Sequence, residues 1–333
     1  MTSPVRVVTV DRGDAGRRLD LVVRRHVADI NSASRTRVQH WIARGDVSIN
    51  GIAVRRVAAR IAAGDVVAIA VPEELGARRT QIDAEPIALE VLYEDDHLLV
   101  VDKPGGLIVH PSYGHASGTL MNALVWRAKA WRGSQRPSVV GRLDKLTSGI
   151  VLVAKTAADH AALQRTLAHR QTIKDYFAVA YGLPRPRQGT IDLRLRHDPA
   201  DRRRITASPT VGAESFTRYE RLDAVTVPRV SVSLVACRLM TGRTHQIRVH
   251  LAARGWPIVG DAKYGEPQWS DVVDSRLAET LRMFPRQALH ASRLVFTHPA
   301  TRERLQIEAP IPTDIRALID AVGLKGPGLL GTG

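Results

Sequence analysis

The sequence contains very little cysteine: Cys237 is the only one among 333 residues. A single cysteine can form neither an intrachain disulfide nor a zinc site of several thiolates, so disulfide scaffolds and zinc fingers are excluded. No apolar run approaches the roughly 18 residues of a membrane helix, which argues against an integral membrane protein. Residues 1–6 lack the apolar core of a secretion signal, so we expect a cytoplasmic protein.

Signatures of several common enzyme sites are also missing. There is no phosphate-binding Gly-x4-Gly-Lys-Ser/Thr segment and no Gly-x-Ser-x-Gly nucleophile turn. His245 and His250 are five residues apart, whereas two histidines that bind one metal from a helix are four apart. We therefore expect an activity that needs no cofactor and no metal ion.

Positive charge is what the sequence has in excess. Lysine and arginine total 48 against 33 acidic residues, giving a net charge of +15. Such an excess favours a polyanionic partner, most commonly nucleic acid. Only seven of the basic residues are lysine. A GC-rich genome accounts for arginine over lysine but not for the net charge, so we predict nucleic-acid binding.

Residues 17–72 read as a small basic domain. Apolar residues at helical spacing predict a helix over 19–27 and a second helix that begins after Ser34, whose hydroxyl can cap it. The pair Asn50-Gly51, between two β-prone runs, predicts a hairpin. The arginines of this domain are either a solvated surface or an RNA-binding one, and we favour the second. They are Arg35, Arg37, Arg44, Arg55, Arg56 and Arg60.

This segment resembles the S-four RNA-binding domain, which is named after a ribosomal protein. The matching residues lie at 18–20, 34–38, 42–47 and 49–51. The pattern is specific, but proteins of many activities share it. The resemblance therefore implies contact with RNA and no chemistry of its own.

The rest of the chain reads as a polar linker at 73–86, a larger domain at 87–320 and a flexible tail at 321–333. Periodicity predicts two helices, at 119–130 and 157–169. The strands expected in the larger domain lie at 87–93, 97–101, 149–154, 175–181, 215–219, 230–239 and 305–308. Because strands outnumber helices and short turns join many of them, we predict an α+β domain around a mostly antiparallel sheet.

Asp144 stands in a polar loop between two apolar runs. Arg142 and Lys145 flank it, and the strand expected at 149–154 follows. A carboxylate in such a loop can project into a cleft as a catalytic group. It can equally cap backbone amides, as aspartate does in most turns.

A second polar segment, 241–252, carries Arg243, His245, Arg248 and His250. Its apolar residues alternate as in a strand, but its end suits a helix, and we predict a helix capped by Thr244. The basic side chains either bind phosphate, pair with a carboxylate or lie on the surface.

Taken in order, these segments resemble pseudouridine synthases of the RluA family, most closely the RluD type that modifies a stem-loop of large-subunit ribosomal RNA. The motif Arg-Leu-Asp of that family matches 142–144 within 140–149. Further matches lie at 102–111, 174–178, 241–252, 255–265, 286–291 and 297–299. One departure is Gly141, which stands where the family usually has histidine. The resemblance implies a mixed, mostly antiparallel catalytic domain of pseudouridine synthase type at 87–320.

The resemblance also implies roles for individual residues. Asp144 is the nucleophile or base, Arg248 is its ion-pair partner, and Tyr176 lies against the uracil and assists loss of the C5 proton. In a closed site burial favours a neutral carboxyl group, and an adjacent guanidinium restores its charge and fixes its orientation. Whether Asp144 attacks C1′ or removes a C2′ proton stays open.

RNA contacts are implied for the residues around this site and in the basic domain. They are Arg142, Arg243, His245, Arg35, Arg37 and Arg44. The target uridine must leave its stack to reach Asp144. We expect a monomer that acts on ribosomal RNA or a pre-ribosomal particle, without a cofactor.

Three other interpretations remain. The same chemistry could act on tRNA. The chain could be a non-catalytic RNA-binding or ribosome-assembly factor, which would not need Asp144 and Arg248 together. Third, the chain could be a hydrolase of sugar bonds, an activity that normally requires two facing carboxylates. Asp95 and Asp96, in an expected turn, offer no clear partner for Asp144.

Overall fold

The computed structural model describes residues 5–326 apart from 12, 28–32, 72–81, 112–114, 116, 134, 169–170 and 266–267. The chain forms two units, Met1–Gln81 and Ile82–Gly333. Of the linker predicted at 73–86, only 82–86 are described, and they belong to the second unit. There the backbone N–H of Glu85 donates to the carbonyl of Asn122 at 3.1 Å, so this end of the predicted linker is anchored.

The first unit contains two helices and a four-stranded sheet. The helices are α1 (Leu19–His26) and α2 (Arg35–Arg44), and the strands in spatial order are β1 (Val5–Thr9), β4 (Val66–Ala70), β2 (Val47–Ile49) and β3 (Ile52–Ala53). Both predicted helices are confirmed, and the hydroxyl of Ser34 accepts the N–H of Arg37 at 3.3 Å. The predicted hairpin is confirmed as well, since Asn50 and Gly51 both have positive φ.

Strand β1 differs from the prediction, because it precedes residue 17, where the basic domain was expected to begin. It pairs with β4 at an edge of the sheet, from Val5 opposite Ala70 to Thr9 opposite Val66. Val5 and Val7 are each 60% exposed. The strand therefore lacks the buried apolar face that makes a strand recognisable in sequence.

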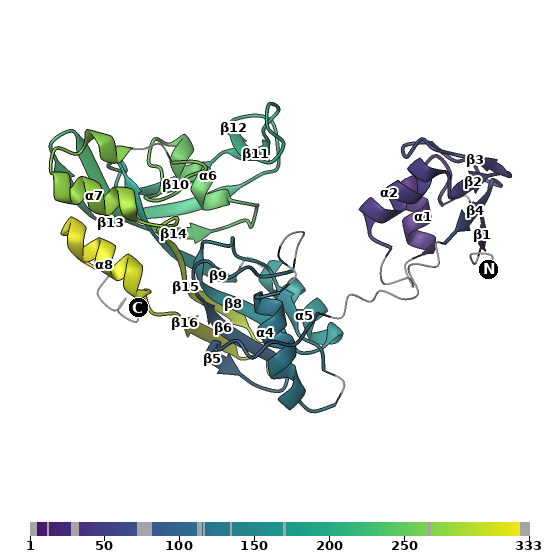
Figure 1. The fold of residues 1–333 in the computed structure, drawn as a ribbon, viewed down its shortest axis with the longest axis horizontal. Coiled ribbons are helices and arrows are strands. Elements are labelled where there is room, and N and C mark those ends of the chain that lie inside the picture. The colour runs from purple at the N-terminus through teal and green to yellow at the C-terminus, as the bar shows by residue number, and fades with distance from the viewer. Residues whose placement is uncertain are drawn as a thin grey trace. The chain divides into compact units, whose positions relative to one another are not determined.

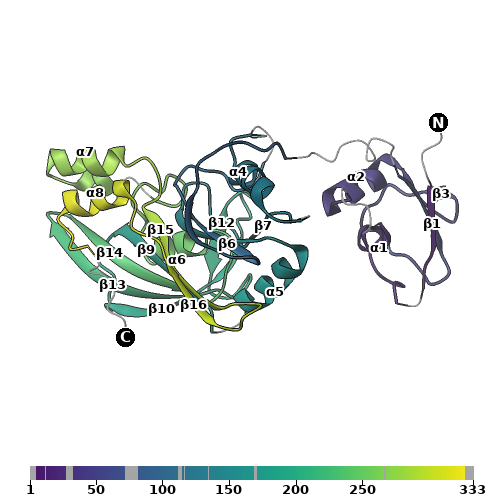
Figure 2. The ribbon, with the colours of Figure 1, turned by 90° about the horizontal axis from the view of Figure 1, so that it is seen from below.

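A sheet of ten strands runs through the second unit (Figures 1 and 2). Eight strands lie in the order β10–β13–β14–β9–β15–β8–β6–β5, with β16 beside β15 and β7 beside β8. Among the strands of the described residues only β8 and β15 pair in parallel, so the unit has a mixed, mostly antiparallel α+β fold, as predicted. The bounds are β5 (Glu90–Glu94), β6 (Leu98–Lys103), β7 (Ser138–Val140), β8 (Ser148–Ala154), β9 (Ile173–Tyr181), β10 (Gln188–Asp192), β13 (Phe216–Val227), β14 (Val230–Leu239), β15 (Leu289–Thr297) and β16 (Arg304–Glu308).

Helices cover this sheet, with α4 and α5 near one end and α7 and α8 near the other (Figures 1 and 2). A separate hairpin of β11 (Arg194–His197) and β12 (Ile205–Ser208) stands beside α6. The helices are α4 (Leu120–Arg127), α5 (Ala157–Ala168), α6 (Gln246–Ala253), α7 (Ser275–Met283) and α8 (Thr313–Val322), with short 3₁₀ turns η1 (Ala128–Ala130) and η2 (Gln268–Asp271). No helix among the described residues is both long and apolar enough to cross a bilayer.

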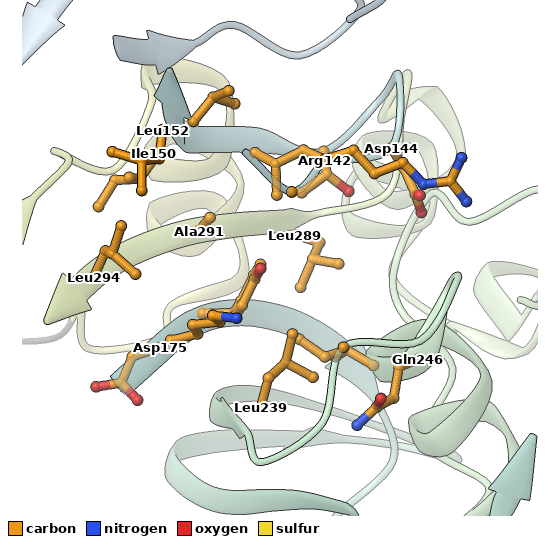
Figure 3. Close-up of a pocket in the computed structure, with 18 of the residues that line it drawn as sticks. Arg142, Asp144, Ile150, Leu152, Asp175, Leu239, Gln246, Leu289, Ala291 and Leu294 are labelled. Atoms are coloured by element: carbon orange, nitrogen blue, oxygen red, sulfur yellow. The ribbon is translucent and has the colours of Figure 1, made fainter. Parts of the chain in front are cut away.

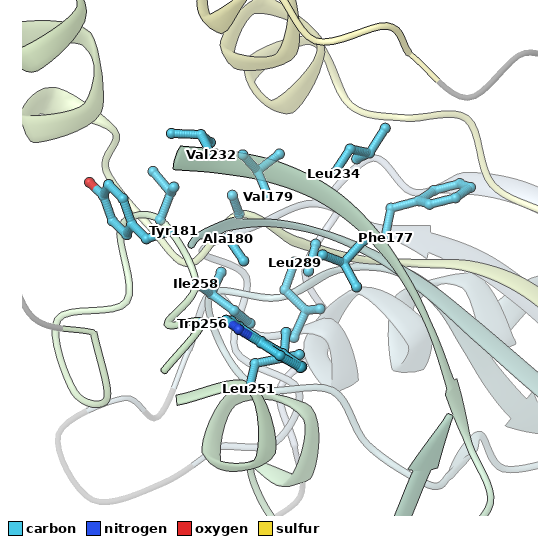
Figure 4. Packing of buried hydrophobic residues seen from close by; sticks show 14 of the residues in the cluster. Phe177, Val179, Ala180, Tyr181, Val232, Leu234, Leu251, Trp256, Ile258 and Leu289 are labelled. Atoms are coloured by element: carbon cyan, nitrogen blue, oxygen red, sulfur yellow. The ribbon is translucent and has the colours of Figure 1, made fainter. Parts of the chain in front are cut away.

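The largest core lies on both faces of β9 and β14. Figure 4 shows Val179 and Leu234 on one side of these strands and Leu251 and Trp256 on the other. Residues of α6 and α8 belong to the same core. Because both faces are covered, β9 is held rigidly, and it carries Tyr176 near its beginning.

The C-terminal segment differs from the predicted flexible tail at 321–333. Helix α8 continues to Val322, Gly323 ends it in the left-handed conformation, and Leu324 is buried in the core. The prediction placed the boundary too early because it did not recognise the apolar stripe of α8. Residues 327–333 lie outside the described part of the chain.

Candidate active site

The loop 141–147 joins β7 to β8 and carries Asp144. Gly149 at the start of β8 explains how closely this region packs. Its φ is 111°, and a Cβ at this position would lie 2.2 Å from the carbonyl oxygen of Ala291 on β15. Only glycine allows this approach of the two strands, which sets the position of the loop above the sheet.

A buried lysine holds the loop from below. Lys103 is fully buried at the end of β6, and its Nζ donates to the carbonyls of Pro104 (2.8 Å), Leu107 (3.1 Å) and Lys145 (3.0 Å). Arg286 adds a second anchor, because its Nη1 donates to the carbonyl of Leu146 at 3.1 Å. The backbone that follows Asp144 is therefore tied to two buried cations.

We expect Lys103→Met to lower the free energy of unfolding by about 3 kcal/mol, because three buried carbonyls lose their donor. Burial lowers the pKa of Lys103 to about 8, whereas an unfolded lysine titrates near about 10.4. Between these pH values the unfolded chain binds a proton that the folded chain does not. Lys103 therefore makes the wild type more stable as the pH rises through this range.

Urea unfolding of the wild type and the variant at several pH values measures this difference. The stability of the variant should rise less between the two pH values. Lys145→Met, which removes an exposed ammonium group from the same loop, is the control and should behave as the wild type does. Equal pH dependence with and without Lys103 would contradict its burial.

Arg248 on α6 bridges two carboxylates. Its Nη1 donates to Oδ2 of Asp144 at 2.8 Å, while its Nε and Nη2 donate to the two oxygens of Asp261 at 2.7 and 2.8 Å. The side chain of Arg248 is 8% exposed and that of Asp144 24%. Burial works against the charged guanidinium, but the hydrogen bonds to Asp261 and Asp144 raise the pKa of Arg248 above its ordinary value.

Asp261 acts as the fixed side of this bridge. Its side chain is 1% exposed, and Oδ1 also accepts the backbone N–H groups of Lys263 (3.0 Å) and Tyr264 (3.1 Å). The fork of Arg248 is therefore oriented by Asp261, which leaves one N–H to point at Asp144. The more exposed of the two carboxylates is the one available for chemistry.

His245 approaches the other oxygen of Asp144. Its Nε2 lies 3.7 Å from Oδ1, and its Nδ1 lies 2.7 Å from the hydroxyl of Tyr264. That hydroxyl accepts the N–H of Ile205 from β12 at 3.1 Å, so its own hydrogen is directed to Nδ1. Burial lowers the pKa of His245, opposed by Asp144. In the neutral ring Nε2 then carries the proton toward Asp144.

The helix predicted at 241–252 is confirmed, but Thr244 does not cap it. α6 begins after His245, which adopts the left-handed conformation with φ of 56°. The hydroxyl of Thr244 instead accepts Nη2 of Arg142 at 2.9 Å. Gln246 organises the turn, since its Oε1 accepts the N–H of Arg243 at 3.0 Å. A side chain inside the helix thus replaces the expected cap.

Tyr176 lines the same cavity as Asp144 and Arg248. Figure 3 shows Asp144 at this cavity, together with Leu289 and Ala291. The cavity measures about 300 Å³, at the small end of ligand sites. Leu289 and Ala291 on β15 form part of its apolar wall. Burial, followed by the charge of Asp144, raises the pKa of Tyr176, so its hydroxyl stays neutral at ordinary pH.

The other predicted site residues fall into two groups. Arg142, Arg243 and His245 line the cavity with Asp144. The remaining three, Arg35, Arg37 and Arg44, lie on α2 in the first unit. Nε of Arg35 is 3.5 Å from Oδ2 of Asp20, and Nε of Arg44 is 3.4 Å from Oδ2 of Asp46. The side chains of these three arginines are exposed.

A second carboxylate, Asp175, also lines the cavity. Arg238 donates to both of its oxygens at 2.7 and 3.0 Å, and Arg293 donates to Oδ2 at 2.8 Å. Two guanidinium groups occupy its oxygens, so it is not the free acid that a sugar hydrolase requires. In the described part of the chain, histidine, cysteine, aspartate and glutamate form no group of three that could bind a metal.

Four residues of the site were not predicted from the sequence: Asp261, Tyr264, Lys103 and Arg286. Each lies inside a segment noted there for its resemblance, at 255–265, 102–111 or 286–291. Lys103 also lies just after the apolar run 98–101, separated from it only by Asp102, and a charge at the end of a buried strand is a usable signal. Nothing in the sequence, however, pairs Asp261 with Arg248.

A family model and two relatives that match this chain are described as pseudouridine or pseudouridylate synthases. Residues 97–253 match the family model described as RNA pseudouridylate synthase. A ribosomal large subunit pseudouridine synthase D of Xylella fastidiosa is 41% identical over 321 residues, which cover 95% of this chain and 92% of that protein. An uncharacterized RNA pseudouridine synthase, YlyB of Bacillus subtilis, is 39% identical over 299 residues, covering 89% and 92%.

Solved structures agree with the sequence relatives. Human RNA pseudouridylate synthase domain containing 4 superimposes with a TM-score of 0.58 at 25% identity, covering 72% of this chain and 95% of that one. Human RNA pseudouridylate synthase domain containing 1 gives 0.55 at 26% identity, covering 72% and 89%. The matched family segment includes Asp144, Tyr176 and Arg248.

Proposed function

This chain belongs to the RNA pseudouridylate synthase family, and we propose that it converts uridine to pseudouridine in large-subunit ribosomal RNA. The observation that supports this most is the convergence of Asp144, Arg248 and Tyr176 on one cavity. The relatives named for the large ribosomal subunit support the choice of RNA. We further propose that the enzyme acts as a monomer in the cytoplasm.

The reaction exchanges one bond to the sugar for another. The C1′–N1 bond breaks, the uracil turns over, and a C1′–C5 bond forms. C5 loses a proton and N1 gains one, so nothing is oxidised and no group leaves the site. The chemistry therefore needs a carboxylate near the sugar and a surface that retains the detached base.

Asp144 supplies that carboxylate. Arg248 binds Oδ2, and Oδ1 is the oxygen that faces Nε2 of His245. Attack on C1′ and removal of a C2′ proton both begin from the ionised group, and the guanidinium stabilises this form in a site that closes on RNA. The second carboxylate, Asp261, holds the guanidinium in place during either route.

Tyr176 retains the uracil through its ring. Its hydroxyl is neutral because its pKa is raised, so it is not a resting base for the C5 proton. Asp144 lines the same cavity and can take this proton once the sugar no longer occupies it. Tyr176 thus assists by keeping C5 within reach, in agreement with the role that the resemblance implies.

The RNA must deliver an unstacked uridine. Flipping a nucleotide costs a few kcal/mol, less in a loop than in a duplex. Arg142 and Arg243 at the cavity are suited to bind the flanking backbone. The first unit, of S-four type, adds phosphate contacts through Arg35, Arg37 and Arg44 on α2.

Deleting residues 1–81 should weaken RNA binding and flatten its dependence on salt. Each phosphate contact that is lost removes about 0.9 from the slope of log affinity against log salt on a duplex. Titration of the RNA at several KCl concentrations measures the slope. The second unit has its own core, so it should remain folded without residues 1–81, and a check of its folding is the control for the deletion. An unchanged slope would show that the first unit does not contact RNA.

Chemical mapping of pseudouridine in cellular RNA, with and without this protein, tests the function. We expect modified positions of large-subunit ribosomal RNA to revert to uridine in its absence, and the purified enzyme to restore them. Loss of pseudouridine from tRNA instead would favour the alternative substrate. Loss from no RNA, with a folded protein, would reject the proposal.

A further inference from the structure

A second cavity adjoins the one that contains Asp144. It measures about 610 Å³ and lies where β9 and β13 begin and β14 ends. Five residues line both cavities: Leu167, Lys174, Leu239, Gly242 and Arg243. An RNA chain that inserts one nucleotide into the first cavity therefore brings a neighbouring nucleotide to the second.

The charges of the second cavity are all of one sign. Lys174, Arg218 and Arg243 line it, and none of the described residues that line it is acidic. Lys174 Nζ donates to the carbonyl of Leu167 at 3.2 Å, and Arg243 Nε donates to the carbonyl of Glu214 at 3.3 Å. These partners are neutral, so the charges stay available to an anion.

Arg218 is the clearest of these unneutralised cations. On the sheet it lies opposite Arg238, and Arg238 lies opposite Asp175. Asp175 is already bound by Arg238 and Arg293. The side chain of Arg218 is exposed and has no hydrogen-bond or ion-pair partner among the described residues. Asp175 is thus already paired with two other arginines, and the side chain of Arg218 remains available to a ligand.

Apolar side chains complete the cavity. Leu167, Leu239, Phe216 and Met240 line it, and Met240 is 45% exposed. An aromatic ring beside backbone-binding cations is the arrangement by which proteins bind unpaired nucleotides. Free of acidic groups, such a surface suits a base together with its phosphate.

We propose that this second cavity binds a nucleotide adjacent to the target uridine, with its phosphate on Lys174, Arg218 and Arg243 and its base over Phe216 and Met240. This inference rests on the proposed function and extends it to the RNA sequence around the target. It makes the enzyme read an unstacked pair of nucleotides rather than a single flipped base.

The test uses the full chain carrying Asp144→Asn, so that RNA is bound without being consumed. The probe is an unmodified transcript of the ribosomal RNA fragment that the wild type modifies. Adding Arg218→Ala should weaken binding several-fold and lower the salt slope by about 0.7, the value for one phosphate of a single strand. Arg316→Ala, on the exposed side of α8 and lining neither cavity, is the matched control and should leave both unchanged.

A second measurement locates the phosphate. Oligonucleotides with one neutral methylphosphonate beside the target uridine should bind more weakly than the unmodified probe. The same linkage should have no further effect on the variant that also carries Arg218→Ala, because its partner is gone. Melting temperatures confirm that each variant is folded.

The outcomes separate this inference from the function. A wild type that isomerises no RNA overturns both. A wild type that isomerises RNA, with Arg218→Ala binding at unchanged affinity and slope, overturns the second cavity alone. Weakened binding with no linkage coupled to Arg218 also overturns it.

Discussion

We expect Asp144→Asn to lower the rate of pseudouridine formation by about 10⁴-fold or more, while RNA binding stays within a few-fold of the wild type. Asparagine has the shape of aspartate, and its oxygen can still accept Nη1 of Arg248. The amide neither attacks a sugar carbon nor removes a proton. Tritium released from C5 of labelled uridine in a transcript measures the reaction directly, because each turnover frees this hydrogen.

A matched substitution tests whether the loss of any negative charge lowers the rate. Asp271→Asn changes an exposed carboxylate that lines neither cavity, so it should leave the rate as in the wild type. Turnover by Asp144→Asn at the wild-type rate would remove Asp144 from the mechanism. A loss of RNA binding as large as the loss of rate would instead assign Asp144 to binding.

Arg248→Lys is the second large effect, with a rate lower by about 10²-fold or more. The guanidinium makes three hydrogen bonds to two carboxylates, two to Asp261 and one to Asp144. One ammonium group cannot reproduce this planar fork. In the lysine variant either Asp144 loses its partner or the buried Asp261 is left partly unpaired. Leaving Asp261 partly unpaired costs several kcal/mol of stability. We therefore expect the rate and the melting temperature to fall together.

Single-turnover rates at saturating enzyme separate this effect from weaker binding. Arg254→Lys, an exposed position at the end of the same helix, is the control and should change neither rate nor stability. A wild-type rate in Arg248→Lys would mean that positive charge alone suffices. In that case the orientation by Asp261 has no catalytic role.

Local signals made much of the secondary structure predictable. The cap at Ser34 and the turn at Asn50-Gly51 depend on atoms within a few residues of one another, and both were expected from sequence. The start of α6 was not. Its geometry depends on Gln246, whose Nε2 donates to the carbonyl of Phe216 on β13, and no short-range rule includes that contact.

Gly141 illustrates the limit of reading a motif. By the resemblance, a histidine is expected at this position in the loop that carries Asp144. Its φ is 82°, a conformation that favours glycine, and a Cβ there would meet no described atom within 4 Å. Lys103 and Arg286 anchor the other end of this loop. Gly141 therefore forms a left-handed turn at the start of the loop, and the anchors at the other end do not involve this position.

The amino-acid sequence alone predicted the basic character and the α+β class, which the structure confirms, and its resemblance to a known family singled out Asp144, Arg248 and Tyr176 as candidate site residues. Only the tertiary structure decided that Asp261 orients Arg248, that His245 approaches Asp144, and that a second cationic cavity adjoins the first. Arg248 and Asp144 are 104 residues apart in the chain. Contacts across such a separation arise from the register and packing of the sheet, which no local pattern of residues encodes.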